Sequence, residues 1–200
     1  TKGIIVARTI AKDHSQKRNL ILTTAAKVCA DTGFDRASMS QLAKACQISK
    51  ANIYHYYDGK DALLFDLLDS YLQTLRNRLA LIDGHGQTTD AHFRALVQEI
   101  LLAYHGADNE HRVQTAGISA LTAEQQTVLR GYQREMVDQM SSVVEAISPE
   151  RFSGNKKDLF EITMSIYGML NWFYMWNRDE TDAARLSYAQ KVSDLVLDGI

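Results

Sequence analysis

The sequence has few residues that interrupt helices. It contains one proline, Pro149, and eleven glycines among 200 residues. Because proline and glycine form most tight turns, their scarcity argues against a fold of many short hairpins. Long stretches rich in Ala, Leu, Gln, Glu, Lys and Met favour helices instead. The sequence therefore predicts an all-α protein.

Cysteine is also scarce. Cys29 and Cys46 lie 17 positions apart, a separation that matches no metal-ligand spacing. Both lie in helical apolar patterns, where a reduced thiol behaves as a small hydrophobic group. The N-terminal stretch carries its charges behind a short apolar run rather than ahead of it, so we expect no signal peptide. These features predict a cytoplasmic protein in a reducing compartment.

Motifs for catalysis and metal binding are missing as well. The sequence has no Gly-rich phosphate loop and no Gly-x-Ser-x-Gly, and none of its six histidines belongs to a Glu-x-x-His pair. We therefore expect neither an enzyme nor a bound metal or cofactor.

One uncharged run is long enough to need an explanation. From Ile162 to Asn177 there are sixteen residues without a charge. A membrane span needs about 18 or more apolar residues and tolerates fewer polar groups than Thr163, Ser165 and Asn171. We predict instead a helix over 155–178 that is buried on two sides, and we expect no membrane partner.

Charge is divided unequally along the chain. Residues 1–60 carry ten Lys/Arg against four Asp/Glu, a net charge of +6, whereas residues 61–200 carry twelve against twenty, a net charge of −8. A small basic part joined to a larger acidic part predicts one surface for a polyanion and a body that avoids it.

Periodic apolar residues predict about nine helices, with Gly33 as a left-handed stop after the first. A capping box begins the second helix, because Gln41 stands three positions after Ser38. Ser49 is a further N-cap, so 38–57 forms a helix-turn-helix. The expected helices cover 15–32, 38–47, 50–57, 60–82, 90–105, 109–120, 122–147, 155–178 and 186–198.

The stretch SKANIYHYYDGK, residues 49–60, has the character of a recognition helix with phosphate-binding flanks. The rear of such a helix packs on its neighbour while its outer side reaches the base edges. The expected base contacts are Lys50, Ala51, Asn52 and His55. The expected phosphate contacts are Ser38, Ser40, Ser49, Tyr54, Tyr56, Lys60 and Lys17. Basic residues further upstream form either a solvated tail or an arm in the minor groove, and we favour the tail, with phosphate contacts near Lys17 and Arg18.

Residues 38–64, SMSQLAKACQISKANIYHYYDGKDALL, resemble the DNA-binding signature of TetR-family transcriptional regulators. The departures are Cys46 and Gln47 for the usual Ala-Gly, Ala51 for a common Gly, and Tyr57 for a common Phe. The resemblance implies a three-helix DNA-binding head, a larger helical body and a homodimer on a palindromic operator. It implies a DNA-binding domain over 1–60 and a ligand-binding and dimerisation domain over 61–200. It also implies a repressor that a small ligand releases.

Two sets of residues in the body follow from this reading. An adaptable apolar pocket is expected at Tyr104, Tyr132, Met136, Met140, Tyr167 and Trp172. The dimer interface is expected on the last two helices, at Leu159, Ile162, Ile166, Gly168, Phe173, Val192, Leu195 and Val196. At the rim of this interface, Asp158 is expected to pair with Arg178 or Arg185.

The nature of the effector rests on a shorter likeness. The segments GMLNWFYMWNRDE and LSYAQKVSDLVLDGI are similar to the C-terminal end of a TetR subgroup that senses acyl-coenzyme A thioesters. The effector is therefore expected to be a small apolar molecule or an acyl-CoA. Two alternatives stay open, namely an activator of the same fold and a helical small-molecule-binding protein with a non-functional DNA head.

Overall fold

A computed structural model describes residues 2–199 of the chain, with side chains for residues 14–199. Within this range every regular element is helical, which confirms the all-α prediction. The elements are α1 (Lys2–Thr32), α2 (Met39–Ala45), α3 (Lys50–Tyr56), α4 (Lys60–Ala80), α5 (Thr89–Ala103), α6 (Asp108–Gly117), the 3-10 turn η1 (Ile118–Ala120), α7 (Ala123–Ile147), α8 (Pro149–Phe152), α9 (Lys156–Asn171), α10 (Phe173–Trp176) and α11 (Asp182–Leu197).

Local signals begin and end the first helices where the sequence places them. Gly33, with φ of +84°, ends α1 in the left-handed region, and its N–H donates to the Cys29 carbonyl at 2.9 Å. The capping box of α2 is present. Ser38 Oγ accepts from the Gln41 N–H at 3.2 Å, and Gln41 Oε1 accepts from the Ser38 N–H at 2.9 Å. Both predictions are confirmed.

The turn between α2 and α3 carries the one left-handed residue other than glycine in the described range. Gln47 has φ of +55°, its N–H donates to the Lys44 carbonyl, and the N–H of Ile48 donates to the Ala43 carbonyl. These two bonds form a Schellman motif, in which the left-handed position is usually glycine. The sequence therefore keeps the turn geometry at the cost of a strained residue.

We expect Gln47→Gly to raise the free energy of unfolding by about 1 kcal/mol, because a left-handed residue with a β-carbon costs roughly 1–2 kcal/mol and the greater freedom of glycine in the unfolded chain offsets part of the gain. Chemical denaturation measures the change. Gln47→Ala is the matched control, since it keeps the β-carbon and should give no comparable gain. Equal stability of the two variants would contradict the strain argument.

The first helix is longer than expected. It begins at Lys2, so the stretch interpreted as a solvated tail is helical in backbone, and that preference is wrong. Its cause is visible in the sequence, because no proline lies between residue 2 and Gly33 to end the helix. The side chains of residues 1–13 lie outside the described part of the structure.

The described chain forms two compact units. The first contains residues up to Tyr71 together with Asn109–Thr127, and the second contains Leu72–Asp108 together with the residues from Val128 onward. The first unit thus extends beyond the expected boundary at residue 60. Packing explains why, because Gly117 at the end of α6 lies against Leu64 and Leu68 of α4, so close that a β-carbon added to Gly117 would lie 3.3 Å from Leu64 Cδ1.

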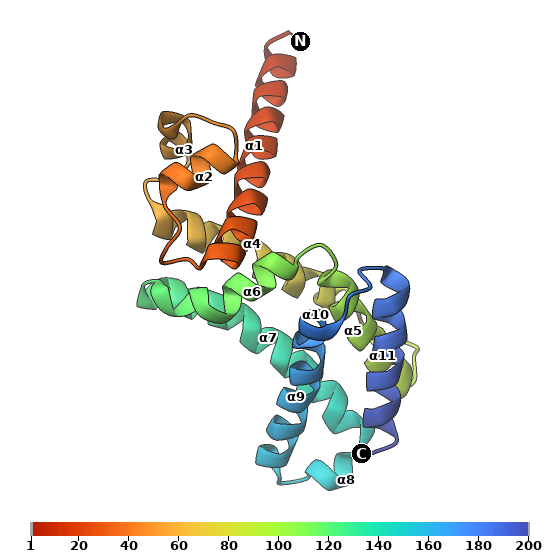
Figure 1. Ribbon diagram of the computed structural model, residues 1–200. Helices are drawn as coiled ribbons and strands as arrows, with labels where there is room; N and C mark the ends of the chain where they lie inside the picture. Colours follow the sequence, from red (N-terminus) through yellow and green to blue (C-terminus); the bar gives the residue numbers. More distant parts are fainter. Residues whose placement is uncertain (1, 200) are drawn as a thin grey trace. The chain divides into compact units, whose positions relative to one another are not determined.

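Within the first unit, α2 packs against both α1 and α3 (Figure 1). Its core consists of side chains that are almost fully buried, among them Ile21, Ala25, Leu42, Ile53 and Leu63. In the second unit, α5 packs along α11, and α9 contacts both of these helices (Figure 1). Phe93, Leu96 and Ile100 of α5 and Ala189 and Val192 of α11 are all buried, and the two helices pack together.

The expected single helix over 155–178 is divided in the structure. α9 ends at Asn171, and the short α10 follows after Trp172. No glycine or proline lies at the break, so tertiary packing determines it. The ring of Phe173 is buried and stacks on Tyr188 of α11 with 4.9 Å between ring centroids. The prediction of one continuous helix is therefore wrong.

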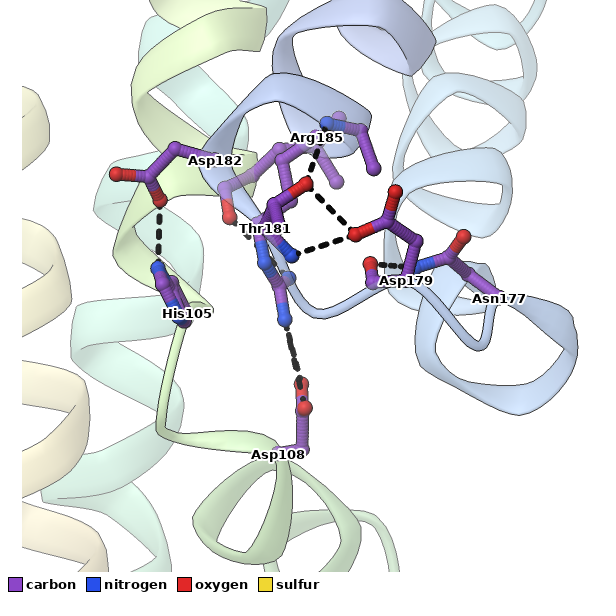
Figure 2. A network of polar contacts seen from close by, with 9 residues as sticks. His105, Asp108, Asn177, Asp179, Thr181, Asp182 and Arg185 are labelled. Carbon is purple, nitrogen blue, oxygen red and sulfur yellow. Dashed lines mark hydrogen bonds and ion pairs between the residues drawn. The ribbon is translucent and has the colours of Figure 1, made fainter.

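A buried arginine connects α11 to the end of α5 and the start of α6. Arg185 is only 2% exposed; its guanidinium donates to the Leu101 carbonyl and pairs with Asp108 at 3.4 Å (Figure 2). Beside it, His105 Nδ1 lies 2.5 Å from Asp182 Oδ1 (Figure 2). Arg185 is therefore not available for the rim pair expected with Asp158, whose carboxylate pairs with Arg151 of the same chain, whereas the alternative pair with Arg178 stays a prediction.

No helix within residues 2–199 combines the length and the apolar character that crossing a bilayer requires. Among residues 14–199, whose side chains the structure describes, no three His, Cys, Asp or Glu side chains gather into a group that could hold a metal ion.

Candidate functional site

The second helix of the helix-turn-helix, α3, has one buried side and one exposed side. Ile53 is completely buried against the rest of the first unit. The four residues expected to read bases, Lys50, Ala51, Asn52 and His55, are all exposed. A recognition helix needs this division, because its rear must hold it in place while its outer side enters the major groove.

Two of the serines expected at phosphates are helix caps. Ser49 Oγ accepts from the Asn52 N–H at 3.1 Å and Ser38 Oγ accepts from the Gln41 N–H. A hydroxyl that accepts an N–H still has its own O–H to donate, so capping is compatible with a phosphate contact. Ser40 and Lys17 are exposed. These assignments stay predictions.

The aromatic residues of α3 differ in their surroundings. Tyr54 is 43% exposed, and the Lys50 ammonium lies 5.9 Å from the centre of its ring. Tyr56 stacks on His14 of α1 at 4.8 Å between ring centroids, with His55 at its edge. The hydroxyl of Tyr54 therefore belongs to the exposed side, whereas the ring of Tyr56 helps to hold α3 beside α1.

Lys60 has a role that the sequence did not predict. Its ammonium donates to the carbonyls of Phe34 at 2.9 Å and Asp35 at 3.2 Å, and it lies 4.3 Å from the centre of the Phe34 ring. Two of the three N–H groups of the ammonium are used in this way, so a phosphate contact through the third stays a prediction. Lys60 closes that turn against the start of α4.

The structure also turns Tyr57 inward, although it follows two positions that are expected to contact DNA. Tyr57 is buried, and its hydroxyl donates to Asp66 of α4 at 2.6 Å. Arg18 of α1 binds the same carboxylate through Nε at 2.8 Å and through Nη2, and its Nη2 also donates to Ser70 at 2.8 Å. One carboxylate thus joins α1, the end of α3 and α4. The phosphate role expected near Arg18 is corrected accordingly.

Burial and these contacts shift the ionisation of the cluster. Burial is the main cause that raises the pKa of Tyr57, and the hydrogen bond to Asp66 raises it further. The hydrogen bond to Asp66 raises the pKa of Arg18 above its ordinary value. Both residues therefore keep their protons at neutral pH, so the cluster is a stable ion pair with a neutral phenol.

Most of the expected pocket residues are part of the core of the second unit. Tyr104 donates to Asn171 Oδ1 at 2.7 Å, and Tyr167 donates to the Met136 carbonyl at 2.9 Å. Burial raises the pKa of Tyr167, and Met140 is completely buried. Trp172 is 59% exposed, so its assignment to an enclosed pocket is wrong.

A small hollow does lie beside two of the expected residues. Met136 lines it together with Arg76, Ala80, Glu135 and Gln139, and its volume is about 170 Å³. Tyr132, one turn before Met136, packs its ring under Arg76, with 5.2 Å between the ring centroid and the guanidinium carbon. The apolar pattern pointed to α7, but it gave no signal for the polar residues Arg76, Glu135 and Gln139.

The expected dimer residues divide into buried and exposed members. Leu159, Ile166, Phe173, Val192 and Val196 are buried within the chain, so their assignment to a surface between subunits is corrected. Ile162 is half-buried, whereas Gly168 and Leu195 are exposed. On α9 the exposed side is instead a stripe that we call the α9 face, formed by Phe160, Met164, Gly168 and Trp172.

These features define a helix-turn-helix DNA-binding protein. Residues 21–67 match the family model described as bacterial regulatory proteins, tetR family. Residues 86–200, more than half of the chain, match the model described as tetracyclin repressor-like, C-terminal domain. The chain belongs to the TetR family of transcriptional regulators, which bind operator DNA and small-molecule effectors and are not enzymes.

Individual relatives agree with this family. The HTH-type transcriptional repressor NemR of Escherichia coli (strain K12) is 29% identical over 80 residues, which are 39% of this chain and 40% of NemR. The chain thus aligns with less than half the length of the curated relatives it matches.

Solved structures show the same fold over most of the chain. A TetR-family transcriptional regulator from Bordetella parapertussis 12822 has 28% identity and a TM-score of 0.85, over 90% of this chain and 94% of that one. AibR in complex with isovaleryl coenzyme A and operator DNA has 23% identity and a TM-score of 0.74, over 90% of this chain and 97% of that one. At that identity, the likeness to AibR concerns the fold alone.

Proposed function

We propose that the protein is a repressor that binds a palindromic operator as a homodimer and leaves it when a small molecule binds the second unit. The proposal rests on the exposure pattern of α3. Lys50, Ala51, Asn52 and His55 are exposed, whereas Ile53 is buried. NemR, which matches the head, is a repressor, and this supports repression over activation. The target, chromosomal DNA, would place the protein in the cytoplasm.

The proposed contacts divide into two kinds. Lys50 and Asn52 present donors that suit the edges of guanine and adenine, and Ala51 presents a methyl group that suits a thymine methyl. Ser40, Tyr54 and Lys17 present exposed donors for phosphate oxygens, which fix the register without reading sequence. Lys60 also belongs to this set, because two of its N–H groups donate to the turn after α1 and the third can donate to a phosphate oxygen.

A second copy of the chain is the proposed partner of the α9 face. Phe160, Met164 and Trp172 are between 43% and 59% exposed, and with Gly168 they recur every four residues along one side of α9. A monomer that left this side in water would expose three large apolar side chains in a row. A two-fold interface covers it with the same face of the partner and sets two recognition helices for two half-sites.

The effector is proposed to bind the second unit beside Met136. The acyl-CoA class has the support of AibR, which was solved with isovaleryl coenzyme A. The hollow beside Met136, at about 170 Å³, has room for a small organic molecule but not for a complete coenzyme A thioester. This hollow therefore suits a small effector rather than a whole thioester.

Selection of binding sites from random duplex DNA tests the proposed function. We expect a two-fold symmetric site whose half-sites lie about one helical turn, roughly 34–36 Å, apart. Asn52→Ala should relax the preference at one base pair in each half-site, at a cost of about 1–3 kcal/mol. Tyr54→Phe is the control, since a lost phosphate contact weakens all sites alike. No enrichment from the random pool would reject the function.

A further inference from the structure

The small hollow beside Met136 has a cation in its wall. Arg76 and Ala80 are one turn apart on α4, and Glu135, Met136 and Gln139 lie on about one turn of α7. The volume of about 170 Å³ is several times the ~30 Å³ that one water molecule occupies in the liquid. The hollow is therefore large enough for a small organic molecule.

The guanidinium of Arg76 uses little of its binding capacity. Its closest anionic contact is one distance of 3.4 Å from Nη1 to Glu135 Oε2, and its Nε is buried with no hydrogen-bond partner among the described residues. A guanidinium has five N–H donors in a planar fork that suits a carboxylate held by two parallel hydrogen bonds. Glu135 is 59% exposed and makes only the weaker single contact.

The rest of the wall is arranged to hold Arg76 in position and to accept an apolar group. The guanidinium carbon lies over the ring of Tyr132, 5.2 Å from its centroid, and this cation–π contact helps to hold Arg76 in place. Met136 and Ala80 supply apolar surface. Gln139 donates its N–H groups to the carbonyls of Leu79 at 2.9 Å and Ile82 at 3.3 Å, so its own carbonyl oxygen is its remaining polar atom.

We propose that this hollow binds a small organic carboxylate, with its carboxylate on the fork of Arg76 and its apolar part against Met136 and Ala80. The proposal deepens the proposed function, on which it rests, by naming the chemical class of the effector. Binding replaces the long contact of Glu135 by a two-point contact, because both anions compete for the same cation. A bound carboxylate thereby changes how α7 holds α4, the helix whose first turns carry Lys60 and Asp66 in the head.

Competition with Glu135 gives the proposal a distinctive consequence. Glu135→Gln removes the internal anion but keeps the size of the side chain, so carboxylates should bind several-fold more tightly. Arg76→Met should abolish the binding. Arg76→Lys keeps the charge but loses the planar fork, and it should weaken binding by about ten-fold.

The test uses the full chain without DNA and two probes, propionate and benzoate, followed by isothermal titration calorimetry. Their amides, propionamide and benzamide, are neutral molecules of the same shape and should bind at least about ten-fold more weakly. Arg130→Met, at an exposed arginine of α7, is the matched control and should bind the carboxylates like the wild-type protein.

Each result supports or overturns the proposal. Equal binding of acids and amides, no binding of either acid, or unchanged binding in both Arg76→Lys and Glu135→Gln would overturn it. A misfolded variant cannot produce the tighter binding expected for Glu135→Gln, so that measurement stays decisive if Arg76→Met is unstable. Because DNA is absent, failure of operator binding leaves this result unaffected, and the two proposals can fail separately.

Discussion

The Asp66→Ala variant should unfold with a free energy about 2–3 kcal/mol below that of the wild-type protein, since hydrogen bonds to charged groups contribute roughly 1.5–3 kcal/mol and partial exposure reduces this. Asp66 accepts from Arg18 and from Tyr57 at once, and its side chain is 25% exposed. Removing it leaves a half-buried cation and a phenol without their acceptor. Urea denaturation followed by circular dichroism measures the loss.

Two further variants separate the contributions at Asp66. Tyr57→Phe removes one hydrogen bond and leaves the Arg18–Asp66 pair, so its cost should be about 1 kcal/mol. Asp61→Ala, at an exposed carboxylate in the first turn of α4, should cost less than about 0.5 kcal/mol. If Asp66→Ala were no worse than Asp61→Ala, the cluster would not hold the head together.

The same cluster should make the free energy of unfolding decrease in alkali. Because the pKa of Tyr57 is raised in the folded protein, the folded state holds the phenol proton more tightly than the unfolded chain does. The associated stability is complete below the ordinary tyrosine pKa of about 10 and is lost as the pH rises above it. The cluster therefore contributes fully at neutral pH.

Local signals made the DNA-binding head predictable from the sequence. Ser38 with Gln41 fixes the start of α2 within four residues, and Gly33 ends α1 at the residue where a left-handed conformation is needed. The signature around α3 then separates buried Ile53 from exposed Asn52 by their positions alone. Each of these features depends on neighbours within one or two turns.

Contacts between distant residues were not predictable in this way. Arg18 meets Asp66 across 48 positions, and Lys60 reaches back 26 positions to the Phe34 carbonyl. Both lysine and arginine carry a charge that suits phosphate equally well, so composition favoured DNA contacts for each. Only the fold shows that carbonyls and a carboxylate of the chain itself already bind them.

The exposed side of α9 was not predictable from the sequence, for a different reason. The helix carries large apolar residues on more than one side, so periodicity could not separate Leu159 and Ile166, which are buried, from Phe160 and Met164, which are exposed. The pattern predicted that α9 has two apolar sides. Packing against α5 and α11 determined which of them stayed uncovered.

Met164→Glu should weaken the dimer strongly, because Met164 lies on the uncovered α9 face. If the α9 face is the centre of a two-fold interface, the substitution places a carboxylate in each half of it. Burying an unpaired charge costs several kcal/mol, so the dimer dissociation constant should rise by at least about 100-fold. Sedimentation equilibrium measures this constant, and operator affinity should fall with it because one monomer holds only one half-site.

A control with the same exposure makes the result specific. Val128 of α7 is 43% exposed, as is Met164, and Val128→Glu adds the same charge away from the α9 face. The control should therefore sediment as the wild-type protein does. Thermal unfolding of both variants separates lost association from lost folding, because an exposed position tolerates glutamate within about 0.5 kcal/mol in the monomer. A Met164→Glu protein that remained dimeric would place the interface elsewhere on the chain.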